Sequence, residues 1–233
     1  MQKDLKYWYL RNHRLFEFMS DDDLNEVCLI VGQKKLKQGD VVDLSDIEED
    51  RIFILKKGVL KLVYTSSEGD YIIHDIIQQG DLFGELRLNA SAIPMEFAEV
   101  VSEEAQICSI STERFKLLLK EKHEICLAYD KIINDKLFKL TSRYQDLVFK
   151  DAHERILSVL HLIAHQLGHQ EEEGLAYENL FSQEEIAQMA CTSRQTVAQT
   201  IKELQNAGVI VYKRNKVIIT KLTKDQSQQT SVK

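Results

Sequence analysis

The 233-residue chain has one proline, Pro94, and only nine glycines. With so few chain-breaking residues we expect an ordered protein, apart from a polar end from about Asp225 to Lys233. No apolar run approaches the roughly 20 residues that cross a bilayer, and the first ten residues lack the apolar core of a signal peptide. These absences predict a cytoplasmic protein that does not contact a membrane.

Cysteine is also scarce, and its spacing excludes common metal sites. Cys28, Cys108, Cys126 and Cys191 lie far apart with no CxxC pair, so neither a zinc site nor an iron–sulfur site is indicated. We expect four reduced and mostly buried thiols. The chain also lacks HExxH, a phosphate-binding GxGxxG and an evident nucleophile–base pair, so we expect no enzyme activity and no cofactor.

The net charge of −7 argues at first against nucleic acid as a partner, but the charges are unevenly distributed. Residues 1–110 hold 12 Lys/Arg and 21 Asp/Glu, whereas residues 182–221 hold 6 Lys/Arg and 3 Asp/Glu. A local basic surface suffices to contact phosphates, because electrostatic attraction acts over a Debye length of about 8–10 Å.

The first part of the chain, to about Ile110, contains short β-like runs. Residues 51–55, 59–64 and 71–77 are rich in β-branched and aromatic residues and are bounded by glycine turns. Gln38-Gly39-Asp40 and Gln79-Gly80-Asp81 repeat one another, which predicts two turns of similar shape. This spacing is typical of an antiparallel sandwich or barrel, preceded by a helix from about Ser20 to Val31.

The second part is helical, with a short helix over Thr112–Lys120 and a long one over His123–Phe149. Apolar residues recur in heptads along the long helix, although the polar Asp130 interrupts the pattern. The stripe could pack on the chain's own sheet, but its length and register favour a two-helix seam in a homodimer. The predicted seam residues are Cys126, Ile133, Leu137, Leu140, Tyr144 and Leu147.

The third part predicts a winged helix-turn-helix. Capping boxes at Asp151 and Ser182 begin helices, and a charged loop is expected over residues 169–179. Helices over 182–190 and 193–207 flank a tight break at Cys191, and Gly208 marks the second helix end. Residues 209–213 and 216–220 form a hairpin across Arg214-Asn215.

The side chains of this unit suit DNA. We expect Ile186, Met189, Val197, Ile201 and Leu204 to hold the two helices together, with the small Ala187 where they cross. The opposite face of the second helix offers side chains that read base edges, since arginine pairs with guanine and glutamine with adenine. Hydroxyls at the helix start and cations on the hairpin favour phosphates. The predicted DNA-binding residues are Ser193, Arg194, Gln195, Thr196, Gln199, Lys202, Lys213, Arg214 and Lys216.

From about residue 15 to 220 the chain resembles the CRP/FNR family. Ser-Arg-Gln-Thr-Val at 193–197 is similar to the start of the family's recognition helix, and Gln79–Leu86 resembles its phosphate-binding cassette. The resemblance implies an α+β fold with a cyclic-nucleotide-binding-like antiparallel β-roll at 1–122, a dimerisation helix at 123–150 and a winged helix-turn-helix at 151–233. It also implies a transcription regulator that binds palindromic double-stranded DNA as a homodimer, contacts RNA polymerase and responds to a small-molecule effector.

The residues that would form the effector pocket depart from the family's pattern. Gly84, Glu85 and Leu86 match the cassette, but alignment on Ala98 places Glu96 where nucleotide-binding members carry the phosphate-binding arginine. Phe97 then stands at the position of a hydroxyl residue. A carboxylate repels the cyclic phosphate, so we predict no useful affinity for cyclic AMP. The pocket then either takes another effector, or the roll is vestigial and only structural. Arg87 is the nearest replacement cation, and Leu140 and Thr141 would face a purine.

The DNA-binding helices and the histidines also show departures from the family pattern or have plainer interpretations. Gln195 and Gln199 replace family residues that read DNA, so the target sequence need not be the usual one, and Cys191 occupies a turn position often held by glycine. His161, His165 and His169 lie on one helical stripe, where a solvated face is favoured over a metal site, and His74 is expected to be a half-buried strand residue. The alternative function is a ligand-sensing module that contacts proteins instead of DNA.

Overall fold

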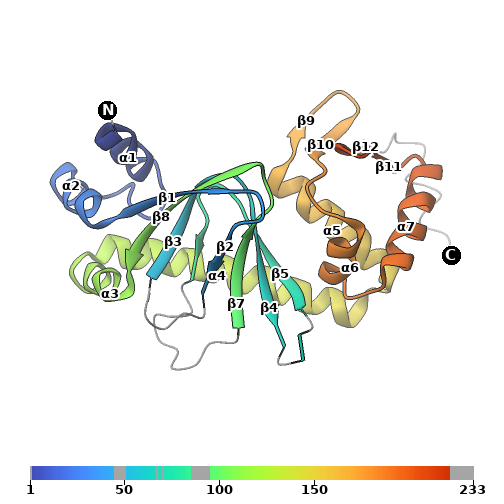
Figure 1. The fold of residues 1–233 in the computed structure, drawn as a ribbon, viewed down its shortest axis with the longest axis horizontal. Coiled ribbons are helices and arrows are strands. Elements are labelled where there is room, and N and C mark those ends of the chain that lie inside the picture. Colours follow the sequence, from blue (N-terminus) through green and yellow to red (C-terminus); the bar gives the residue numbers. More distant parts are fainter. Residues whose placement is uncertain (1, 45–50, 67, 70, 85–94, 221–233) are drawn as a thin grey trace. The chain divides into compact units, whose positions relative to one another are not determined.

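The computed structural model describes residues 2–44, 51–66, 68–69, 71–84 and 95–220, which form two compact units, Met1–Arg143 and Tyr144–Lys233. The division falls within the longest helix, α4 (Figure 1). No helix in the described ranges combines the length and apolar character needed to cross a membrane.

The first unit is an antiparallel β-roll with helices before and after it. Two four-stranded sheets have the orders β1-β8-β3-β6 and β2-β7-β4-β5. The elements are α1 (Gln2–Arg11), α2 (Asp21–Ile30), β1 (Gly32–Lys37), β2 (Val41–Asp43), β3 (Arg51–Lys57), β4 (Leu60–Thr65), β5 (Tyr71–Ile77), β6 (Leu82–Phe83), β7 (Met95–Val100), β8 (Glu104–Ser111), α3 (Thr112–Glu121) and α4 (His123–Phe149).

Two apolar cores hold this unit together. One lies inside the roll and includes Leu55, Leu60 and the stacked rings of Phe53 and Phe83. The other joins the helices to the roll around Phe16, Phe115 and Ile132. The start of α4 therefore packs on its own unit through a buried face, while its other face stays open.

The two repeated turns have the same geometry, as the sequence predicted. Gly39 and Gly80 have φ of +82° and +88°, a region that glycine occupies without strain. Each following aspartate bonds the backbone N–H three residues earlier: Asp40 accepts from Lys37 at 2.8 Å, and Asp81 accepts from Gln78 at 3.0 Å. The aspartate side chain thus closes both turns.

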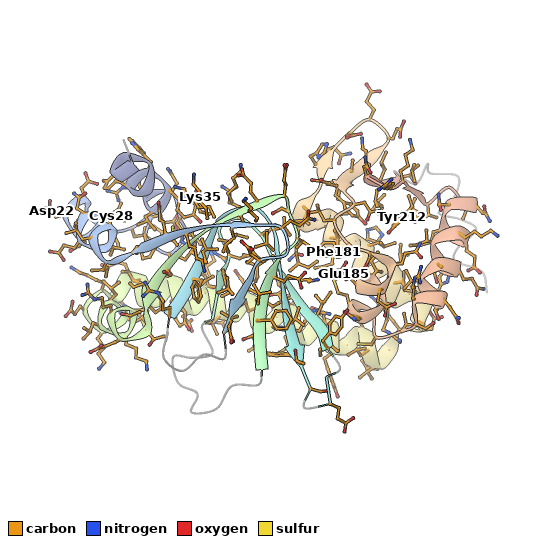
Figure 2. All side chains as sticks on the ribbon, viewed as in Figure 1. Asp22, Cys28, Lys35, Phe181, Glu185 and Tyr212 are labelled. Carbon is orange, nitrogen blue, oxygen red and sulfur yellow. The ribbon has the colours of Figure 1, made fainter. Side chains whose placement is uncertain are left out.

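The second unit contains α5 (Ala152–Leu167), β9 (His169–Gln170), β10 (Gly174–Glu178), α6 (Gln183–Met189), α7 (Arg194–Asn206), β11 (Ile210–Tyr212) and β12 (Lys216–Thr220). The strands form one sheet in the order β11-β12-β10-β9. Both predicted capping boxes are present, Asp151 with Glu154 and Ser182 with Glu185. Of these residues, Glu185 is labelled in Figure 2. Gly208 has φ of +70° after α7, so the predicted helix stop is confirmed.

Several expectations need correction. Residues 169–179 are not only a loop, because β10 pairs with β12 through the run Leu175-Ala176-Tyr177. The N-terminal segment forms α1, and β1, β2, β6, β7 and β8 were not predicted. The expectation of mostly buried cysteines is wrong. Cys108 is buried and Cys28 is half-buried, whereas Cys126 and Cys191 are exposed.

Candidate DNA-reading surface and effector cavity

The helix pair α6–α7 is held by the apolar residues that the sequence predicted. Ile186, Met189, Val197, Ile201 and Leu204 are all buried. Ala187 is buried too, and its carbonyl accepts a hydrogen bond from the N–H of Thr192 at 3.0 Å, which sets the turn between the helices. A larger side chain at this crossing would force the helices apart.

The opposite face of α7 is polar and open. Ser193 caps the helix, because its hydroxyl accepts from the N–H of Thr196 at 3.1 Å, and the two hydroxyls lie 2.8 Å apart. Thr196 is half-buried, whereas the other predicted readers on this helix are exposed: Ser193, Arg194, Gln195, Gln199 and Lys202. Buried and exposed side chains alternate with the period of the helix, so one face of α7 packs in the unit and the opposite face is open.

A strained residue and one arginine define the turn before α7. Cys191 has φ of +49°, the one positive value among the described residues that are not glycine. The Arg155 guanidinium on α5 donates to the carbonyls of Ala190 at 2.9 Å and Cys191 at 3.1 Å. It also donates to the carbonyl of Lys150 at 2.9 Å. Arg155 was not among the predicted residues, since a single arginine in an amphipathic helix gives no signal.

A second missed residue is Glu203 on the recognition helix. Its carboxylate accepts from the Gln199 amide at 2.9 Å and lies 3.4 Å from Nδ1 of His153. His153 is also 3.2 Å from the hydroxyl of the buried Thr200. Gln199 is therefore held along the helix by Glu203.

The wing is the β11–β12 hairpin, with Arg214-Asn215 at its tip as predicted. The N–H of Lys213 donates to the carbonyl of Lys216 at 2.8 Å. Asn179 anchors the hairpin: its amide donates to the carbonyl of Lys213 at 3.0 Å, and the Tyr212 hydroxyl, labelled in Figure 2, reaches its Oδ1 at 3.5 Å. Lys213 and Arg214 are exposed and available to phosphates.

Lys216 differs from the other wing cations because an acidic turn engages it. Its ammonium donates to both carboxylate oxygens of Glu171 at 2.7 Å. Glu171 also contacts Nε2 of His169 at 2.9 Å. With Glu172 and Glu173 it forms what we call the acidic turn, residues 171–173, which lines a groove of about 740 Å³ shared with Lys213 and Lys216.

The long helix α4 carries an exposed apolar stripe. Of the predicted seam residues, Leu140 is 64% exposed and Tyr144 66%, and Leu137, Leu147 and Cys126 are also exposed. Ile133 is half-buried. Four further apolar residues of this helix are exposed and were not among the predicted seam residues: Leu127, Phe138, Val148 and Phe149.

A cavity of about 350 Å³ lies between the β-roll and α4, within the first unit. Glu96 on β7 lines it, and its side chain is only 5% exposed. Nε2 of His74 on β5 lies 2.8 Å from the Glu96 carboxylate. The His74 ring stacks on Tyr64 of β4, with centroids 3.9 Å apart. Three neighbouring strands thus hold the carboxylate in place.

Cations of α4 form the other wall of the cavity. The Arg143 guanidinium donates to the carbonyl of His74 and, at 3.4 Å, to that of Ile73. Lys136 donates to the carbonyl of Leu82 at 2.6 Å. Lys139 lines the same wall. The helix is therefore bonded to the strands of the roll by side chains that reach backbone oxygens.

Comparison with known proteins agrees with this architecture. A model described as the cyclic nucleotide-binding domain matches residues 33–122, and the Crp-like helix-turn-helix domain matches residues 154–224. The chain belongs to the CRP/FNR family. Family members are DNA-binding transcription regulators, and the order of β-roll, long helix and winged helix-turn-helix is the family's fold.

Proteins similar to this chain come from several bacteria. The CRP-like cAMP-activated global transcriptional regulator of Mycobacterium tuberculosis is 25% identical over 171 residues, 73% of this chain and 76% of that protein. A CooA mutant from Carboxydothermus hydrogenoformans has a similar structure, with a TM-score of 0.68, 22% identity and coverage of 88% and 90%. The c-di-GMP-responsive regulator CLP of Xanthomonas campestris has a TM-score of 0.70, 17% identity and coverage of 87% and 100%.

The family's pocket residues are only partly brought together here. Gly84, Glu96 and Leu140 line the cavity. Phe97 does not, because successive residues of β7 point to opposite faces of the sheet. Thr141 is exposed and bonds the carbonyl of Leu137 on its own helix at 2.9 Å. Glu85, Leu86 and Arg87 lie outside the described residues.

The other histidines have ordinary surroundings. The rings of His161 and His165 on α5 lie 6.5 Å apart. His169 does not share their helical stripe, because α5 ends at Leu167 and His169 lies in β9, where Glu171 contacts it. Over the described ranges, no group of three or more His, Cys, Asp or Glu residues is arranged to hold a metal ion. His74 is half-buried in β5, as expected, but its bond to Glu96 was not foreseen.

Proposed function

We propose that the protein is a sequence-specific transcription regulator that binds a palindromic DNA site as a homodimer. The observation that carries the proposal is the exposed polar face of α7, where Arg194, Gln195 and Lys202 stand opposite a fully buried face. Arg194 suits a guanine edge, and Gln195 suits an adenine. Lys213 and Arg214 on the wing would hold the flanking phosphates.

The exposed stripe of α4 supports the dimer. Leu137, Leu140 and Tyr144 leave large apolar surfaces open in a single chain, and a second copy of the helix would cover them at heptad spacing. Two reading helices related by a two-fold axis would then enter successive major grooves, roughly 34 Å apart. Bound at a promoter, such a dimer would act on transcription through RNA polymerase.

We also propose that the cavity takes an effector other than cyclic AMP. Glu96 is fixed at the position of the phosphate-binding arginine by its bond to His74, so a phosphate there would meet a buried carboxylate. Leu137 and Leu140 line the cavity and also belong to the exposed stripe. A bound molecule would therefore act directly on the dimer seam. Calorimetry should detect no cyclic AMP binding with a dissociation constant at or below about 10 µM. Dissociation constants of about that size correspond to binding free energies of about 7–8 kcal/mol.

The experiment that tests DNA binding compares two arginine variants of the full-length protein. Genome-wide footprinting finds the site, and fluorescence anisotropy then measures affinity for it and for a scrambled duplex. Arg194→Ala should lower specific affinity by roughly tenfold or more, as expected for loss of one bidentate base contact. Arg114→Ala, on the exposed surface of α3, removes the same charge and should leave affinity unchanged.

The same experiment tests the alternative. A protein-contact module would lose nothing with Arg194→Ala and would show equal affinity for the specific and scrambled duplexes. Light scattering during gel filtration checks that both variants remain dimers, so that a loss of binding is not caused by dissociation.

A further inference from the structure

The two walls of the cavity between β-roll and α4 carry opposite charges. On the sheet side, Glu96 and Asp75 present carboxylates. On the helix side, Lys136, Lys139 and Arg143 present cations. A cavity with separated charges of opposite sign favours a ligand that itself carries two opposite charges, because each charged group then gains a partner when it leaves water.

On each wall, one charged group retains capacity for a ligand. Glu96 has one side-chain partner among the described residues, the ring of His74 at its Oε1, yet its side chain is 95% shielded from solvent, being 5% exposed. A carboxylate can accept several hydrogen bonds, so its second oxygen remains available. On the helix side, Arg143 and Lys136 are bonded to backbone carbonyls.

Lys139 is the remaining helix cation. It is half-buried, lines the cavity and makes no hydrogen bond or ion pair with any residue that the structure describes. It interacts with the charge of Asp81 only through space. An ammonium group in such surroundings is a suitable partner for a carboxylate. The lining also includes the apolar side chains of Leu62, Ile133, Leu137 and Leu140, which suit the apolar part of a ligand.

We propose that the cavity binds a small zwitterion of the α-amino-acid class, with its ammonium group on Glu96 and its carboxylate on Lys139. The volume of about 350 Å³ lies at the small end of ligand sites and fits a molecule of this size. The inference rests on the proposed function, since it names the class of effector. Glu96 would then bind the positively charged group of the ligand, at the position where a phosphate site would carry an arginine that binds a negative group.

The test uses the full-length protein and matched probes. The twenty proteinogenic amino acids are screened at about 10 mM by thermal shift, and binding is measured by calorimetry. For a positive amino acid, the amine without the carboxylate and the acid without the amine are measured too. For phenylalanine these are 2-phenylethylamine and 3-phenylpropanoate. We expect each to bind on the order of tenfold more weakly than the amino acid, because each loses one charge-assisted bond.

Two variants then test which residue binds the ammonium group of the ligand and which binds its carboxylate. Glu96→Gln should weaken the amino acid and leave the amine-free acid unchanged, whereas Lys139→Gln should weaken the amino acid and leave the carboxylate-free amine unchanged. This crossed pattern separates ligand contact from a general loss of structure, which would weaken all probes. If Glu96→Gln fails to fold, Lys139→Gln with its matched amine decides alone.

The proposal is overturned if all twenty amino acids fail to bind, or if the crossed pattern is absent. DNA binding of the same samples keeps this result distinct from the proposed function. Protein that binds its palindrome but no amino acid refutes only the ligand class. If the protein binds an amino acid but shows no preference for any duplex, the proposed function as a sequence-specific regulator is refuted and the proposed amino-acid site is retained.

Discussion

The ammonium of Lys216 donates to both carboxylate oxygens of Glu171, each at 2.7 Å. The pair is partly exposed, so its contribution to stability is small. Its consequence is for DNA binding, because one of the three wing cations is neutralised before any phosphate approaches.

The first prediction concerns the salt dependence of DNA binding. Each phosphate contact contributes about 0.9 to the slope of log K against log salt concentration. Lys213→Gln should reduce the magnitude of that slope by about 0.9 per subunit, or about 1.8 for the proposed dimer, while Lys216→Gln should leave it nearly unchanged. Glu171→Gln should increase it, since Lys216 is then released to a phosphate. Equal losses for the two lysine variants would show that Glu171 gives up its partner when DNA binds.

The second prediction concerns the positive φ of Cys191. A left-handed backbone costs a side-chain-bearing residue about 1–2 kcal/mol, and a β-branched residue tolerates it least. Cys191→Val should therefore lower the free energy of unfolding by about 1–2 kcal/mol, whereas Cys191→Gly should leave it nearly unchanged. Denaturant titration followed by circular dichroism measures both. A Val variant as stable as the Gly variant would exclude strain at this turn.

The third prediction concerns acid stability and His13. Its Nδ1 accepts from the N–H of Leu15 at 3.1 Å, and its Nε2 lies 3.0 Å from the carbonyl of Gly80. Burial lowers the pKa of this imidazole from 6.5 to about 4. The unfolded chain thus binds the proton first, and stability falls as the pH drops from 6.5 to 4. The loss reaches about 3 kcal/mol below pH 4.

His13→Gln is the matching control, since glutamine can donate to the Gly80 carbonyl without titrating. The difference in stability between the two proteins should vary between pH 6.5 and 4 and stay constant above pH 7. Comparing the two cancels the opposite effect of Asp81, whose carboxyl pKa is raised by burial. A pH-independent difference would mean that His13 has the same pKa in the folded and unfolded states, so that burial does not lower it.

The fourth prediction concerns the homodimer. Tyr144→Asp places a charge on the exposed stripe of α4, where two copies would meet across the two-fold axis. The dimer dissociation constant should rise by roughly a hundredfold, because two carboxylates would be desolvated without partners. Analytical ultracentrifugation measures it. Gln145→Asp, one residue further along the helix, adds the same charge outside the predicted seam and should have little effect.

Local signals in the sequence were enough for the helices and the β11–β12 hairpin of the second unit. The capping boxes at Asp151 and Ser182, the glycine stop at Gly208 and the hairpin across Arg214-Asn215 each depend on a few adjacent residues, and each was predicted at the position found. The separation of Val197 and Ile201 from Arg194 and Gln195 follows from helical period alone.

Pairings between distant segments were not predictable in this way. β10 is too short to be recognised, and becomes a strand because Leu175, Ala176 and Tyr177 pair with β12 some forty residues later. The same applies to Glu96, which sequence comparison marked only as a missing arginine. Its bond to His74 joins two strands that are not adjacent in the chain, and only the folded roll brings the two side chains together.

The reach of Arg155 bears on how a signal can travel through the second unit. Its guanidinium bonds the backbone at Lys150, one residue past the end of α4, and also at Ala190 and Cys191. Only Lys150 and Asp151 connect α4 to α5. One guanidinium group therefore bonds both the residue that follows α4 and the turn between α6 and α7. If two α4 helices pair as proposed, we expect a change in their crossing angle to rotate the α6–α7 pair as one piece and to alter the spacing between the two reading helices.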